Sequence, residues 1–185
     1  MFFIAVEGLD GSGKTTLVEA LAKRFRFAKG AYPERRTEIG ELIDRVLKNK
    51  IEIDPVALAH LFVANRWETV KFLKSTRPTV LDRYILSGQA YALSNGVELD
   101  LVTEMDRGLP LPNLTVFLDS PPKSCRVSTD EKFEGSEFQE RVYESFKLLL
   151  KRLPQERVMM IPSETSVSKA IEMFSNWYEV FGASG

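Results

Sequence analysis

A glycine-rich segment near the N-terminus has the residue types and spacing of a phosphate-binding loop. The segment GLDGSGKT follows the apolar run FFIAV and precedes a helical pattern, which is the strand, loop and helix order of a P-loop. Its glycines let backbone N–H groups approach an anion, while Lys14 reaches the outer phosphates and Thr15 offers a hydroxyl to Mg²⁺. A nucleoside triphosphate is therefore expected to bind here. The nucleotide-binding residues expected are Gly8, Gly11, Ser12, Gly13, Lys14, Thr15 and Thr16.

Two charged groups follow predicted strands, at the edge where open parallel sheets bind ligands. Asp82 could complete a Mg²⁺ site with Thr15, and Arg83 could bind a phosphate through two hydrogen bonds. A strand-end salt bridge is the alternative for Asp82 and Arg83. The second group, YPERR at 32–36, places an aromatic ring beside two guanidinium groups. Taken alone, it is more typical of a turn with a solvated charge pair.

One helical run offers a face that could bind a planar ring. Phe62 and Arg66 are four residues apart, so both side chains lie on one helix face and could stack on, and hydrogen-bond to, the same base. A core aromatic beside a surface arginine fits this spacing equally well. His60 is the only histidine of the chain, and without a partner in the sequence it is given no catalytic role.

Composition limits the class of protein and its partners. The chain has 185 residues, of which 44% are hydrophobic, and a formal charge of -1. This length predicts one compact domain over residues 1–185, and the near-neutral charge disfavours a nucleic acid polymer as partner. The only cysteine, Cys125, excludes an internal disulfide and is expected to be a buried or neutral thiol. No apolar run is long enough for a signal segment or a membrane span, which predicts a cytoplasmic protein without a membrane partner.

Short apolar runs alternate with helical patterns, which predicts an α/β fold with a five-stranded parallel sheet flanked by helices. Strands are expected at FFIAV, 79–84, 114–120 and 157–162, with a weaker one between Arg26 and Tyr32. Helices are expected from Gly13 to Phe25, from Asp54 as N-cap through Val70, and over Ser87–Ser94, Leu99–Arg107, Glu137–Arg152 and Val167–Phe181. The polar segment 128–136 is either a solvated loop or a mobile lid.

The order of these motifs resembles the thymidylate kinase family. The segments that carry the resemblance are GLDGSGKTT, YPERR, FVANRW, DRYILSGQAY and EKFEGSEFQER, from Phe2 to about Phe146. The resemblance implies a three-layer P-loop kinase fold with a lid at about 126–137. It also implies transfer of the γ-phosphoryl group of ATP to thymidine monophosphate with Mg²⁺, by an enzyme that usually forms homodimers. The apolar stripe at Leu58, Leu61 and Trp67 could serve a dimer or could equally be core.

The resemblance also implies roles for single residues. Arg35 and Arg83 match the arginines that hold the acceptor's phosphate. Phe62 matches the aromatic that stacks on thymine, and Arg66 matches the arginine that hydrogen-bonds a thymine carbonyl. Tyr91 matches the aromatic beneath the sugar, where it would leave no room for a 2′-hydroxyl. The acceptor-binding set expected also contains Asp10, Tyr32, Ser87, Gly88, Phe133 and Gln139.

The sequence departs from the family pattern in its catalytic arginines. Many members carry one directly after the P-loop acid or in the lid, whereas this chain has Gly11 at the first place and Lys132 as the only base of its lid segment, STDEKFEGS. Because such an arginine is worth about 10³ to 10⁵ in rate, Lys132 and Arg126 are expected to share its work. Arg126 could instead stack on adenine. The catalytic set expected is Asp10, Lys14, Arg83, Arg126 and Lys132.

Two other functions remain open from the sequence. A deoxynucleoside kinase shares the P-loop and the arginine after a strand-end acid, but it acts on an uncharged nucleoside, for which Glu34 could serve as the carboxylate base. Arg35 and Arg83 favour instead an acceptor that already carries a phosphate. The other possibility is a P-loop module that binds a nucleotide with little turnover, which the missing arginine would fit.

Overall fold

A parallel sheet forms the centre of the fold. The computed structural model describes residues 1–73, 77–125 and 135–182 of the chain. The strands lie in the order β2-β3-β1-β4-β5, and each is parallel to its neighbours. They are β1 Phe3–Gly8, β2 Ala28–Ala31, β3 Thr79–Asp82, β4 Leu114–Asp119 and β5 Val158–Pro162. The predicted α/β fold with a five-stranded parallel sheet is confirmed.

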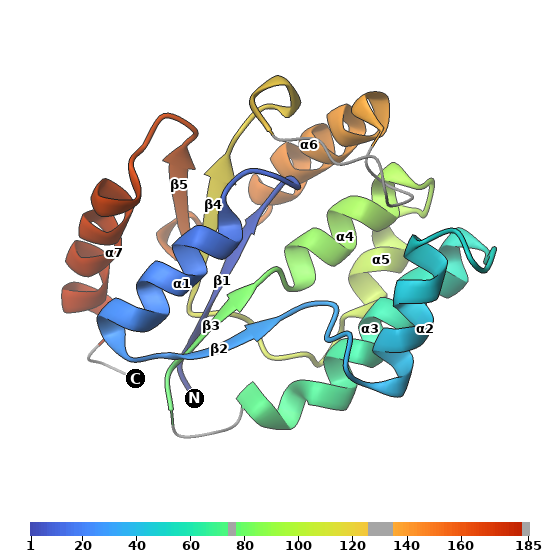
Figure 1. The fold of residues 1–185 in the computed structure, drawn as a ribbon, viewed down its shortest axis with the longest axis horizontal. Helices are drawn as coiled ribbons and strands as arrows, with labels where there is room; N and C mark the ends of the chain where they lie inside the picture. Colours follow the sequence, from blue (N-terminus) through green and yellow to red (C-terminus); the bar gives the residue numbers. More distant parts are fainter. Residues whose placement is uncertain (74–76, 126–134, 183–185) are drawn as a thin grey trace.

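Helices cover both faces of this sheet and give the fold three layers (Figure 1). One face is covered by α1 Lys14–Phe25 and α7 Val167–Phe181. The other face is covered by α3 Pro55–Leu73, α4 Ile85–Ser94 and α6 Ser136–Leu150. Outside them, α2 Glu38–Leu47 packs against α3, and α5 Leu99–Met105 packs against α3 and α4. Two short 3-10 helices, η1 Pro122–Ser124 and η2 Gln155–Arg157, complete the elements of the described residues.

The central strand β1 is buried along its whole length because helices cover both of its faces. Ile4 and Val6 point into the core beneath α1 and α7. Phe3 and Ala5 alternate with them and point into the core beneath α3. Glu7 is also buried, at 1% exposure, although it is an acid in an otherwise apolar strand.

Local signals fixed the helix ends where the sequence contained them. Asp54 Oδ1 accepts a hydrogen bond from Val56 N at 2.8 Å, so Asp54 caps α3 as predicted. The helix Val167–Phe181 has the bounds expected of it. The other predicted helices differ by a few residues at one or both ends, and their observed ranges are Lys14–Phe25, Pro55–Leu73, Ile85–Ser94, Leu99–Met105 and Ser136–Leu150.

The helix α2 was not predicted. Thr37 caps it, since Thr37 Oγ1 accepts a hydrogen bond from Gly40 N at 3.1 Å. Ile43 and Val46 are fully buried on its inner face. Gly40 in its first turn is a weak helix former, which weakens the helical signal of the segment.

The topology places a ligand site at one edge of the sheet. Strands β2 and β3 lie on one side of β1, and β4 and β5 lie on the other, so the strand order reverses at β1. Open parallel sheets bind ligands outside the carboxyl ends of their strands at such a reversal. Gly8 ends β1 and Asp82 ends β3 at this edge.

Among the described helices, none has the length and the apolar composition that a membrane span requires.

Candidate functional site

A cavity of about 790 Å³ opens at the edge of the sheet where the carboxyl ends of the strands lie. It is bounded by the P-loop, the segment after β2, and helices α3 and α4. Its volume lies in the range of small-molecule sites. Most residues that the sequence predicts for a site come together in its lining. They are Asp10, Gly11, Gly13, Lys14, Thr15, Thr16, Tyr32, Arg35, Phe62, Arg66, Asp82, Arg83, Ser87, Gly88 and Tyr91.

The P-loop carries its lysine in a buried position. Gly13 adopts a φ of 95° at the N-cap of α1, a conformation that favours glycine. Lys14 Nζ donates a hydrogen bond to Leu9 O at 2.5 Å. Burial, and then the charge of Arg83, lower the pKa of Lys14 to about 8. The ammonium and the N-terminus of α1 therefore face the same part of the cavity that a phosphate chain would use.

Thr15 and Asp82 meet at the base of the P-loop. Thr15 Oγ1 donates a hydrogen bond to Asp82 Oδ2 at 2.6 Å, from the first turn of α1 to the end of β3. A hydroxyl and a carboxylate are oxygen ligands of the kind that Mg²⁺ prefers. The donor set therefore fits the predicted metal.

Arg83 connects several elements around the cavity. Its Nη1 donates to Gly8 O at 3.0 Å and to Ser87 Oγ at 2.9 Å, while Nη2 donates to Asp10 Oδ1 at 2.5 Å. The guanidinium also lies 5.2 Å from the centre of the Tyr91 ring. The side chain is only 15% exposed. It thereby links the P-loop to α4 across the cavity.

The positive charges of this network lower the pKa of Asp10, the acid beside Arg83. Burial alone would raise the pKa of Asp10, but the positive charges of Arg83 and Lys14 outweigh it and lower the pKa to about 2. Tyr91 Oη donates a hydrogen bond to Asp10 Oδ2 at 2.5 Å. Burial raises the pKa of Tyr91 above its ordinary value. At neutral pH the site therefore holds a carboxylate, a phenol and a guanidinium.

Glu7 is a site residue that the sequence analysis missed. Its carboxylate accepts hydrogen bonds from Tyr84 N at 3.0 Å, from Ser87 N at 3.2 Å and from Ser87 Oγ. Burial raises the pKa of Glu7 above its ordinary value. These contacts satisfy N–H groups at the start of α4 and hold the residues that flank Arg83. The only signal in the sequence was a lone acid in an apolar strand.

Arg66 is buried at 3% exposure, so it is not the surface arginine of the alternative prediction. Its Nη2 donates to Asp106 Oδ1 at 2.5 Å, and Gln89 donates to Asp106 Oδ2 at 3.1 Å. The Nε atom of Arg66 is buried without a hydrogen-bond partner in the described residues. A Cβ atom added at Gly88 would lie 2.5 Å from Arg66 Nη1, so glycine makes room for the guanidinium. Asp106, also missed, is the ion-pair partner of Arg66.

Phe62, Tyr32 and Arg35 line the same cavity as this arginine. Phe62 packs partly against the core between α2 and α3 and lines the cavity. The ring of Tyr32 packs 5.3 Å from that of Tyr84. Arg35 forms an ion pair with Asp44 of α2. An aromatic ring, a buried cation and a half-exposed cation thus face one space.

Three of the predicted residues that the structure describes lie outside this lining: Gly8, Ser12 and Gln139. Gly8 contributes its carbonyl to Arg83, and Gln139 is buried on α6 and hydrogen-bonds with Tyr91. Ser12 Oγ is buried and has no hydrogen-bond partner within the described ranges. Arg126, Lys132 and Phe133 lie outside the described residues.

Cys125 is partly buried, and burial raises the pKa of its thiol, as expected of a neutral thiol.

Comparisons with known proteins agree on one family. The family model described as thymidylate kinase matches residues 6–173 of the chain. A thymidylate kinase of Schizosaccharomyces pombe is 34% identical over 177 residues, which cover 89% of this chain and 84% of that protein. The solved structure of a thymidylate kinase from Candida albicans superposes with a TM-score of 0.84 at 29% identity, covering 97% of this chain and 91% of that one. A thymidylate kinase structure from Ehrlichia chaffeensis gives a TM-score of 0.74 at 24% identity, covering 94% and 98%, and supports the fold.

Replacing Asp106 with Asn should destabilise the protein strongly. The change removes the charge partner of Arg66 where both side chains are buried, and breaking such a pair costs about 3–5 kcal/mol of the free energy of unfolding. Glu104→Gln is the matched control, because Glu104 pairs with Arg107 at the surface with side chains 56% and 77% exposed. It should cost about 0–1 kcal/mol. Urea denaturation measures both, and equal small losses would contradict the buried pair.

Affinity for a nucleoside triphosphate should fall at alkaline pH. The pKa of Lys14 is lowered to about 8 in the free protein, so the ammonium that attracts phosphate is lost as pH rises through that value. Below pH 8 the affinity should be constant, and above it the Kd of a non-hydrolysable ATP analogue should rise toward about tenfold per pH unit. Calorimetric titrations from pH 7 to 9.5 measure this change. Lys14→Arg, which keeps its charge, should show no such decline, and a flat wild-type profile would refute the shift.

Proposed function

Because this chain belongs to the thymidylate kinase family, we infer that it transfers the γ-phosphoryl group of ATP to thymidine monophosphate and produces thymidine diphosphate. The observation that carries this function is the position of Arg83. Its guanidinium lies between the P-loop and the acceptor side of one cavity, with Asp10 and Tyr91 as partners. A cation there can bind the acceptor's phosphate next to the donor's phosphate chain.

The donor side is proposed to bind ATP with Mg²⁺. Backbone N–H groups from Gly11 to Thr16 and the ammonium of Lys14 would hold the phosphates. Thr15 and Asp82 would hold Mg²⁺, which supplies neutralisation of phosphate charge when it is bound. The hydrogen bond of 2.6 Å between these two side chains supports their common role.

The acceptor side is proposed to recognise each part of thymidine monophosphate. Arg35 and Arg83 would bind the phosphate, and Phe62 would stack on the base. Arg66 would donate to a thymine carbonyl, which its place in the cavity lining and its buried charge support. Tyr91, held by Asp10, would lie beneath the sugar and exclude a 2′-hydroxyl.

Catalysis in this site is proposed to rest on alignment and charge neutralisation. Phosphoryl transfer needs no covalent nucleophile when donor and acceptor are held in line and their charge is compensated. Lys14 and Arg83 would supply that compensation from the described part of the site. Lys132 and Arg126 of the lid segment are proposed as the further cations.

A deoxynucleoside kinase is less well supported. That reaction would need Glu34 as a base, but the Glu34 carboxylate accepts hydrogen bonds from Arg36 Nε at 2.9 Å and Nη2 at 2.6 Å. Those bonds lower the pKa of Glu34 below its ordinary value, which makes it a weaker base. The neighbouring Arg35 also favours an acceptor that already carries a phosphate.

We further propose a cytoplasmic homodimer. Leu58 of the suspected stripe is buried in the core, whereas Trp67 and Phe72 of α3 are each 42% exposed. Exposed aromatic side chains are enriched where protein surfaces associate. Analytical ultracentrifugation tests this state, because a monomer at all concentrations would exclude it.

Release of ADP should be fastest with thymidine monophosphate when the purified protein is given ATP, Mg²⁺ and a panel of acceptors. Deoxyuridine monophosphate lacks only one methyl group, worth about 1–3 kcal/mol in an apolar pocket, so it should react more slowly but measurably. Uridine monophosphate should be excluded by Tyr91, and free thymidine should fail because it has no phosphate for Arg35 and Arg83. Deoxycytidine monophosphate presents an amino group to Arg66 and should also fail. Greatest turnover with free thymidine would instead identify a nucleoside kinase.

Lys132→Ala should lower kcat and leave the KM for both substrates nearly unchanged. The lysine is proposed to act on charge that develops during transfer, so its loss removes stabilisation of the transition state. The expected decrease is about 10²-fold or more, judged from the 10³ to 10⁵ of catalytic arginines. Steady-state kinetics measure it, with Lys123→Ala as the control for loss of a nearby positive charge. Unchanged kcat in Lys132→Ala would remove the residue from the mechanism.

A further inference from the structure

The segment 32–37 joins β2 to α2 and carries Arg35. We refer to it as the 32–37 loop. Arg35 is 42% exposed along its side chain, and its guanidinium forms an ion pair with Asp44 of α2. The reach of that guanidinium therefore depends on this ion pair and on the backbone on either side of Arg35. That backbone is held by a residue outside the cavity lining.

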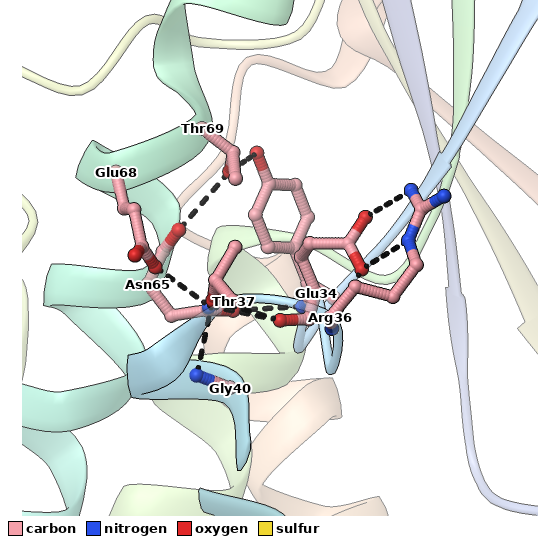
Figure 2. Close-up of polar contacts among 8 residues, drawn as sticks. Glu34, Arg36, Thr37, Gly40, Asn65, Glu68 and Thr69 are labelled. Atoms are coloured by element: carbon pink, nitrogen blue, oxygen red, sulfur yellow. Dashed lines mark hydrogen bonds and ion pairs between the residues drawn. The ribbon is translucent and has the colours of Figure 1, made fainter. Parts of the chain in front are cut away.

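The side-chain amide of Asn65, on α3, both accepts a hydrogen bond from and donates one to the main chain of Glu34, the residue before Arg35 (Figure 2). Its Oδ1 accepts from Glu34 N at 2.7 Å, and its Nδ2 donates to Glu34 O at 3.1 Å. The Asn65 side chain is completely buried. A side-chain amide that pairs with both groups of one residue replaces the partners that a neighbouring strand would give.

The far end of the 32–37 loop is held by the same amide. Asn65 Nδ2 donates to Thr37 Oγ1 at 3.0 Å, and Thr37 Oγ1 donates to Glu34 O at 3.1 Å. Gly40 N in turn donates to Thr37 Oγ1, as Figure 2 shows. Loop, α3 and the first turn of α2 thus share one hydrogen-bonded cluster.

The first turn of α2 lies close against the loop. A Cβ atom added at Gly40 would lie 1.8 Å from Glu34 O and 2.9 Å from Arg35 Cα. Both atoms belong to the backbone, which cannot move aside as a flexible side chain could. Glu34, the neighbour of Arg35, is therefore hydrogen-bonded by Asn65 and closely approached by Gly40.

Asn65 directly precedes Arg66 on the same helix. One turn of α3 consequently fixes two groups: the buried guanidinium of Arg66, and the backbone that carries Arg35. A helix turn is rigid on the scale of a ligand. Asn65 thereby links the helix turn that carries Arg66 to the loop that carries Arg35.

We propose that Asn65 is a positioning residue for the acceptor, which holds Arg35 at the distance from Arg66 that spans a nucleoside monophosphate. The proposal rests on the proposed function, in which Arg35 binds the phosphate and Arg66 the base. Asn65 touches neither and acts through the 32–37 loop.

The test is a double-mutant cycle on acceptor kinetics. Asn65→Ala should raise the KM for thymidine monophosphate at least tenfold, because small misplacement of a binding group costs up to about 10²-fold. The KM for ATP should stay within about twofold. In an Arg35→Ala background, Asn65→Ala should add less than about twofold, since its effect passes through Arg35. An equal effect in both backgrounds, or none, overturns the proposal.

Two control variants separate positioning from loss of stability. Glu68→Gln alters a residue that contacts Asn65 Nδ2 at 3.4 Å but not the loop, and should leave the KM for thymidine monophosphate unchanged. Phe174→Leu weakens the core under α7, on the opposite face of the sheet, and should lower the Tm without changing that KM. If Phe174→Leu raised it as much as Asn65→Ala, a merely structural role would explain the result.

A second measurement applies if Asn65→Ala does not fold. The Glu34 amide hydrogen, bonded to Asn65 Oδ1, should exchange slowly in the wild-type protein without ligand, and rapid exchange overturns the proposal. Gly40→Ala places a Cβ atom against Glu34 O and must displace the loop. It should therefore raise the KM for thymidine monophosphate while leaving the KM for ATP unchanged. Arg35→Ala alone tests the proposed function: an unchanged KM there removes Arg35 from the acceptor site, whereas a raised KM with an additive cycle overturns only the role of Asn65.

Discussion

The buried charge of Arg83 is the constraint on which the site depends. A guanidinium removed from water must be hydrogen-bonded and compensated, or its burial costs several kcal/mol. Its partners are Gly8 O at the end of β1, Ser87 Oγ in α4 and the Asp10 carboxylate in the P-loop. Satisfying one charge therefore fixes the P-loop relative to the helix that carries Tyr91. Arg83 also has a φ of 65°, which is uncommon for a residue other than glycine, and Glu7 holds the backbone that follows it.

Helix α3 is the second element that positions the site. Arg83 is one side chain with partners on several elements, whereas α3 is one element whose neighbouring side chains contact different parts of the site. Phe62 and Arg66 face the cavity, while Asn65 holds the backbone of the 32–37 loop. Asp106 compensates the charge of Arg66 from beyond α5. One helix thereby relates two residues of the cavity lining to the loop that bears Arg35.

The sequence predicted the features that depend on neighbouring residues and missed those that depend on distant ones. The P-loop and the Asp54 cap of α3 are local patterns, and they were recognised because each sets its own backbone conformation. Glu7 was missed because its partners are 77 and 80 residues away, and Asp106 because Arg66 is 40 residues away. A buried acid differs from a surface acid only in its surroundings, and those come from the fold. The strand order places them together, and no short window of sequence contains it.

Electrostatics couple the charge of Lys14 to a bound phosphate. Burial and then the charge of Arg83 lower the pKa of Lys14, while the carboxylates of Asp10, Asp82 and Glu7 oppose that shift. A phosphate bound at either cation reduces their repulsion and favours the protonated form of Lys14. Because a pKa of about 8 already leaves Lys14 mostly protonated at neutral pH, this effect grows only above pH 8. There a bound phosphate keeps charged the same ammonium that holds it.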